Sequence, residues 1–180
     1  ENITITTNTP AKPSKEQIIK QAIQFHLKGN ISEAKKYYQY CIKEGFNDSM
    51  VFSNYGSILK GIGNLEEAEL YTRKAIKLNP NFVEAHYNLA IILIELGNLE
   101  EAELYTRKAI ELNPTLANSY FNLGNILRNL GNLKEAESAY QKAIELKPDY
   151  AEAYYFLSKL NNSNDNKIWK EQLFSKNILN

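Results

Sequence analysis

Apolar residues recur along this chain every three or four positions, and short polar segments interrupt the runs. Tyr120, Leu123 and Leu127 show the spacing, which places them on one face of an amphipathic helix. Gly131 follows at the expected end of that helix, where a glycine can take the left-handed backbone that helix C-termini favour. The pattern therefore predicts helices separated by tight turns.

A second helix is expected directly after this turn. Asn132 is a suitable N-cap, and Glu135 at the third position after it gives a pattern close to a capping box. Ala136 and Tyr140 then fall on the face that this helix would bury. Pro148 ends it, because proline cannot continue a helix. Together the two segments form one helix–turn–helix unit.

The same unit recurs along the chain with a period of about 34 residues. The repeat is most evident in the segment GNLEEAELYTRKAI, which occurs at residues 63–76 and again, with an identical sequence, at residues 97–110. One such helix pair cannot bury its own apolar face, whereas stacked copies bury it between neighbours. The repeat frames are 15–48, 49–82, 83–116 and 117–150, and residues 151–160 begin a fifth copy.

Several sites of the unit follow a known pattern. The first helix has a large residue and then Leu-Gly or a close variant, and the second has two small residues before a closing proline. The large site holds Phe52, His86, Tyr120 and Tyr154, the first small site holds Ala68, Ala102 and Ala136, and the prolines are Pro80, Pro114 and Pro148. On these residues the chain resembles the tetratricopeptide repeat family. The resemblance implies an all-α fold: a right-handed α-solenoid (superhelix) of antiparallel helix pairs, with about four units plus a degenerate fifth unit and a C-terminal capping helix.

Some sites depart from the family pattern. Thr72 and Thr106 stand where the family usually has an aromatic residue, whereas Tyr38 and Tyr140 conform. The first unit also lacks the closing proline and has Phe46 in its place.

Two terminal segments flank the expected array at 15–160. Residues 1–14 contain two prolines and little to bury, so we expect a disordered or linker segment. Residues 161–180 are expected to form a polar loop and a helix that caps the open end of the stack. Trp169 and Phe174 contribute to an apolar face on that helix.

Charge and composition narrow the possible partners. Lys plus Arg and Asp plus Glu each total 21, so the formal net charge is zero. This balance argues against a nucleic-acid partner and against an anionic membrane surface. No apolar run reaches the roughly 18 residues that a membrane helix needs. We expect a bacterial, cytoplasmic protein without a membrane partner.

No catalytic or cofactor site is apparent in the sequence. His26 and His86 lie in different repeat units, and neither has a metal ligand at the usual spacing, so packed or solvated imidazoles are expected. Cys41 is the sole cysteine and falls on a small-residue site, which predicts a core residue. Glycine-rich phosphate loops are absent. We therefore expect no cofactor, no metal and no enzymatic activity in this chain.

The sixth position of each unit faces the concave groove in the tetratricopeptide family. Here it holds Asn54, Asn88 and Asn122, which resemble the asparagine ladder in the superhelix of the enzyme that adds N-acetylglucosamine to serine and threonine. A side-chain amide offers both a donor and an acceptor, so a column of amides could hold a peptide backbone of any sequence. Duplication and a general abundance of asparagine would explain the same column without a function.

Aromatic residues accompany the asparagines. The fifth position holds Tyr87, Phe121 and Tyr155, and Asn125 and Arg128 are expected on the same side. Exposed aromatic residues are common binding anchors. Packing between repeats accounts for them equally well.

The sequence is compatible with three functions. The first is a protein–protein interaction scaffold that binds an extended peptide or a helix of a protein partner in the groove. The second is a substrate-presenting N-terminal module of a larger transferase (sulfo-, glycosyl- or methyltransferase), of which this chain would be a fragment. The third is a self-assembling solenoid, a homo-oligomer that pairs through its terminal helix.

Overall fold

The computed structural model describes residues 13–160, and within them the chain forms nine helices and no strand. The predicted capping helix, with Trp169 and Phe174, and nearly all of the predicted N-terminal linker lie outside the described residues. The helices are α1 (Lys15–Leu27), α2 (Ile31–Lys43), α3 (Ser49–Gly61), α4 (Leu65–Leu78), α5 (Val83–Glu95), α6 (Leu99–Leu112), α7 (Ala117–Asn129), α8 (Leu133–Leu146) and α9 (Ala151–Leu160).

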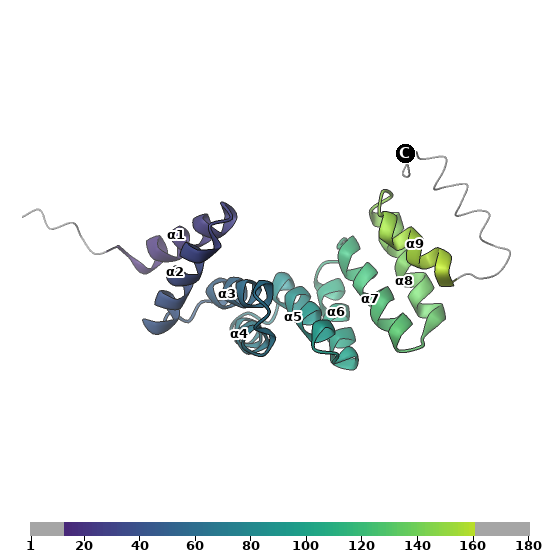
Figure 1. Ribbon diagram of the computed structural model, residues 1–180, viewed down its shortest axis with the longest axis horizontal. Helices are drawn as coiled ribbons and strands as arrows, with labels where there is room; N and C mark the ends of the chain where they lie inside the picture. Colours follow the sequence, from purple (N-terminus) through teal and green to yellow (C-terminus); the bar gives the residue numbers. More distant parts are fainter. Residues whose placement is uncertain (1–12, 161–180) are drawn as a thin grey trace, which may run out of the picture.

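The helices stack in chain order. Each helix packs against the next one, and the first helices of neighbouring units also touch, α3 with α5 and α5 with α7. Figure 1 shows the resulting row, from α1 at one end to α9 at the other. The predicted all-α solenoid of helix pairs is confirmed, and α9 takes the place of a first helix in the fifth repeat frame.

Glycines end the first helices as predicted. Gly131 has a φ of 84°, and its N–H donates to the Arg128 carbonyl at 3.1 Å. The N–H of Asn132 donates to the Leu127 carbonyl at 2.8 Å. This pair of bonds is a Schellman motif, which satisfies carbonyls that the helix end would leave without a partner.

The first unit uses the same motif to end its second helix. Gly45 has a φ of 74°, and the N–H of Phe46 donates to the Cys41 carbonyl at 2.9 Å. A glycine therefore does here what the closing proline does in the other units, which explains how Phe46 can stand in the proline's place.

The expected capping box at Asn132 and Glu135 was wrong. Asn132 is the N-cap of α8 by position, but its side chain makes no capping hydrogen bond. Its φ of −83° and ψ of 63° are those of an inverse γ-turn, and the N–H of Leu133 donates to the Gly131 carbonyl at 3.0 Å. The Asn132 N–H already donates to the Leu127 carbonyl, so the Glu135 side chain cannot bond it as a capping box requires. A capping box forms instead at the start of α1, between Ser14 and Gln17.

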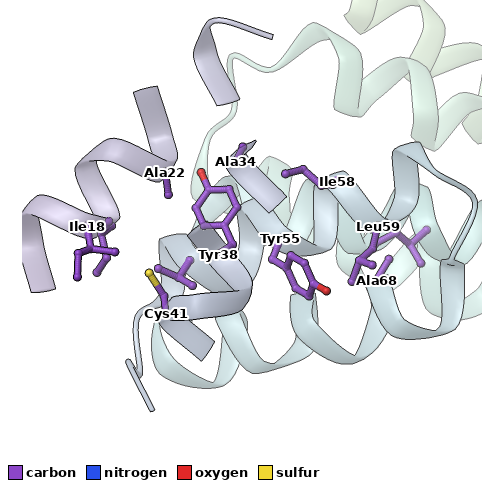
Figure 2. Close-up of a cluster of buried hydrophobic side chains, with 12 residues drawn as sticks. Ile18, Ala22, Ala34, Tyr38, Cys41, Tyr55, Ile58, Leu59 and Ala68 are labelled. Atoms are coloured by element: carbon purple, nitrogen blue, oxygen red, sulfur yellow. The ribbon is translucent and has the colours of Figure 1, made fainter. Parts of the chain in front are cut away.

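The core runs between the stacked helices. Figure 2 shows its N-terminal part, where Tyr38 and Cys41 on α2 pack with Ala22 on α1. Ala34 and Ala68, at the small-residue sites of two units, are fully buried. Cys41 is buried as predicted, and burial raises the pKa of its thiol.

The two threonines at the aromatic sites are also buried. Each hydroxyl donates to a carbonyl one turn earlier in its own helix, Thr72 to Ala68 and Thr106 to Ala102, both at 2.7 Å. The intrahelical bond satisfies the polar group, so a threonine can replace the aromatic residue without an unpaired buried hydroxyl.

Candidate functional site

The three asparagines of the sixth position lie on the first helices. Asn54 is on α3, Asn88 on α5 and Asn122 on α7, and each is half-buried. Because α3 contacts α5 and α5 contacts α7, the three asparagines lie on neighbouring helices, at equal positions of the repeat. The structure thus leaves each of the three asparagines partly accessible to solvent.

Two of these amides have no partner in the part of the chain that the structure describes. Within residues 13–160, Asn88 and Asn122 make no side-chain hydrogen bond. Asn54 lies beside the buried hydroxyl of Tyr38. Burial raises the pKa of Tyr38 to about 12, and the Asn54 side chain lowers it in part. The donor and acceptor of Asn88 and Asn122 therefore remain available to a ligand.

The aromatic residues of the fifth position differ in exposure. Tyr155 on α9 is 55% exposed, whereas Tyr87 and Phe121 are half-buried. The ring of Phe121 lies 4.9 Å from that of Tyr150 and 5.9 Å from that of Tyr140, measured between centroids. Packing between repeats thus accounts for much of the burial of the Phe121 ring, whereas the Tyr155 ring is accessible to a partner.

The remaining predicted residues join the same aromatic cluster. Asn125 accepts a hydrogen bond from the Tyr140 hydroxyl at 2.8 Å. The guanidinium of Arg128 lies 4.4 Å from the centroid of the Phe156 ring, at cation–π distance. Asn125 and Arg128 are therefore held in place by α8 and α9.

Sequence reasoning missed Phe156. It lies one full repeat after Asn122 and so takes the sixth position in the fifth unit, where its ring stacks on Tyr140 at 6.0 Å. The repeat register was the signal that could have found it. The column of asparagines therefore ends, at α9, in an aromatic ring covered by a guanidinium group.

His86 is a packed residue, in agreement with the sequence. It is 4% exposed, its ring stacks on Tyr105 at 5.8 Å, and its Nε2 lies 2.7 Å from the Pro80 carbonyl oxygen. A carbonyl can only accept, so this contact assigns the proton to Nε2.

The part of the chain that the structure describes holds no group of three or more His, Cys, Asp or Glu residues that could bind a metal ion. In the same part, none of the helices has the length and apolar character needed to cross a membrane.

Sequence comparisons agree with this architecture. A model of the tetratricopeptide repeat matches residues 117–150, the span of the fourth unit. A model of the middle TPR-like domain of cilia and flagella-associated protein 70 matches residues 20–122, more than half of the chain. No curated protein matches the chain.

Solved structures show the same fold. MamA from Desulfovibrio magneticus RS-1 is 24% identical, with a TM-score of 0.78, and the match covers 92% of this chain and 94% of that chain. YrrB, described as a TPR protein with an unusual peptide-binding site, is 22% identical, with a TM-score of 0.76 and coverage of 92% and 87%. At such identities the similarity concerns the fold alone. Together with the repeated helix pairs and the two sequence models, it shows that this chain belongs to the tetratricopeptide repeat family.

Proposed function

We propose that this chain is a protein-interaction module that holds an extended segment of a partner protein along its first helices. The observation that carries the proposal is the column of Asn54, Asn88 and Asn122, half-buried at equal positions of α3, α5 and α7. The amides of Asn88 and Asn122, which bond no other residue within 13–160, are suited to pair with the peptide groups of a ligand.

The chemistry favours recognition of the main chain over recognition of a particular sequence. A side-chain amide can donate to a peptide C=O and accept from a peptide N–H, and both groups are present in almost every residue of an extended segment. Hydrogen bonds of this kind contribute about 0.5–1.5 kcal/mol each, so several in a row are needed for a useful affinity.

Side-chain anchoring would come from the C-terminal end of the column. Tyr155 is exposed there, and Lys159 lies 5.2 Å from its ring centroid. Together with Phe156 and Arg128, these residues give that end an aromatic surface with positive charge. We expect a ligand with an apolar or acidic residue at this end of the segment.

The similarity to YrrB supports the proposal, since the description of that protein names a peptide-binding site on the same fold.

The test is a selection from a peptide-display library. Peptides enriched on the native chain are then measured for binding to a groove variant, with Asn54, Asn88 and Asn122 all changed to Ala. The matched control changes Asn64, Asn98 and Asn132 to Ala. These three asparagines also recur once in each repeat, are exposed and make no capping hydrogen bond.

We expect the groove variant to lose the selected peptides and the control variant to keep them. Equal binding by all three proteins would place the binding surface elsewhere and would contradict the proposal.

A further inference from the structure

The second helices differ in the residue that precedes the aromatic site. Units two and three have Tyr71 and Tyr105 there, and the fourth unit has Ala139 at the equivalent place. Tyr71 stacks on Phe52 at 5.9 Å, and Tyr105 stacks on His86 at 5.8 Å. Each ring thus covers the large residue on the first helix of its own unit.

Arg73 of the preceding unit completes the arrangement around Tyr105. Its Nη1 donates to the Tyr105 hydroxyl at 3.0 Å, its Nε to Glu69 at 2.8 Å and its Nη2 to Glu101 at 2.8 Å. One guanidinium therefore binds two carboxylates and one phenol hydroxyl.

Arg107 repeats this arrangement one unit later with one bond missing. Its Nε donates to Glu103 at 2.7 Å and its Nη2 to Glu135 at 2.9 Å. Nη1 has no acceptor within residues 13–160, because Ala139 provides no hydroxyl where Tyr105 provides one. The two copies of the duplicated segment thus supply equivalent arginines, Arg73 and Arg107. Only Arg73 has a tyrosine hydroxyl to bond.

A cavity lies where the missing ring would be. It has a volume of about 210 Å³ and is lined from α7 by Tyr120, Leu123 and Leu127, and from α6 and α8 by Arg107, Glu135, Ser138, Ala139 and Lys142. Its floor is apolar, and its rim carries the Arg107–Glu135 ion pair. At this size it suits a single side chain better than a drug-sized ligand.

We propose that this cavity binds a tyrosine side chain of a partner protein. The ring would lie against Tyr120 as Tyr105 lies against His86, and the hydroxyl would accept from Nη1 of Arg107 as that of Tyr105 accepts from Arg73. The site is separate from the groove of the proposed function, since none of its lining residues is among the predicted groove residues.

The probe is N-acetyl-tyrosinamide, titrated into the full chain and followed by NMR of backbone amides and methyl groups. We expect saturable shifts at Ala139, Leu123 and Leu127, at millimolar concentrations of probe. N-acetyl-phenylalaninamide should bind several-fold more weakly, because it cannot accept the hydrogen bond from Arg107.

Two variants locate the site. Ala139→Tyr restores the residue found in units two and three and should abolish binding while the chain stays folded. Arg107→Gln should weaken the tyrosine probe several-fold and leave the phenylalanine probe unchanged. Arg73→Gln is the matched control and should change neither affinity, because Arg73 already bonds a tyrosine of the chain.

The most direct test moves the cavity from position 139 to position 105. In the double variant Ala139→Tyr, Tyr105→Ala, the shifts should move to the residues around position 105, while circular dichroism confirms the helix content. Absence of shifts in the native chain, or shifts that persist in Ala139→Tyr alone, would overturn the proposal. A change in Trp169 fluorescence in Ala139→Tyr would also overturn it, because the chain's own terminal segment would then be the occupant of the cavity.

Discussion

At the scale of single residues, close contact between the helices of one unit depends on small side chains. A Cβ atom on Gly124 would lie 2.5 Å from the ring of Tyr140. That ring cannot easily move, because its hydroxyl bonds Asn125 and its face stacks on Phe156. A Cβ on Gly61 would meet no atom of the described residues within 4 Å.

Gly124→Ala should therefore destabilise the chain by about 1–3 kcal/mol through overpacking. Gly61→Ala, also in a helix, should be neutral or stabilise by up to about 1 kcal/mol, because alanine favours the helix more than glycine does. Urea unfolding of both variants measures the difference. An unchanged unfolding free energy for Gly124→Ala would mean that α7 and α8 can separate without cost.

At the scale of the elements, two N-caps with similar sequence signals work differently. Asp48 begins α3, and its carboxylate accepts from the Val51 N–H at 3.0 Å. Asn132 begins α8 through a γ-turn, without a side-chain bond.

Asp48→Ala should cost about 1 kcal/mol of stability, the usual value for a lost N-cap bond. Asn132→Ala should cost less than about 0.5 kcal/mol, as for a surface residue without a special contact. Thermal and urea unfolding of the two variants compare them directly. If Asn132→Ala proved the more costly substitution, its side chain would be capping α8 in solution after all.

The helices could be predicted from the sequence because the spacing of apolar residues and the glycines and prolines at helix ends depend on local sequence. The repeat register also gave the positions of Asn54, Asn88 and Asn122 on neighbouring helices. The exposure of each residue could not be predicted, since it depends on contacts between units. Phe121 is held by Tyr150, which lies directly before α9, whereas Tyr155 at the same repeat position is exposed. The cavity beside Ala139 could not be predicted either, because Arg107, which also lines it, belongs to the preceding unit.

At the scale of the whole molecule, buried tyrosines link stability to alkaline pH. Burial raises the pKa of Tyr38, Tyr140 and Tyr150, each to about 12. In the unfolded chain tyrosine titrates near pH 10. Below that pH both states are neutral and the contribution of these residues is fully present.

As the pH rises from about 10 to about 12, the unfolded chain loses these protons first, so the folded state should lose stability across that interval. Urea unfolding at a series of pH values, together with the ultraviolet absorbance of tyrosinate, follows both effects. Tyr38→Phe should reduce the slope. A titration in which every tyrosine of the folded chain ionises near pH 10 would contradict the burial of these three hydroxyls.

We expect the asparagine column to hold the main chain of a ligand. The most direct measurement takes a peptide selected on the native chain and replaces single backbone amides with esters, which removes one N–H donor at a time. Binding by calorimetry is then compared between the native chain and single Asn→Ala variants at positions 54, 88 and 122. We predict that particular esters weaken binding to the native chain about 2- to 10-fold, and that each loss disappears in the variant lacking the facing asparagine. Ester and alanine effects that simply add at every position would show that these asparagines do not bind the peptide backbone.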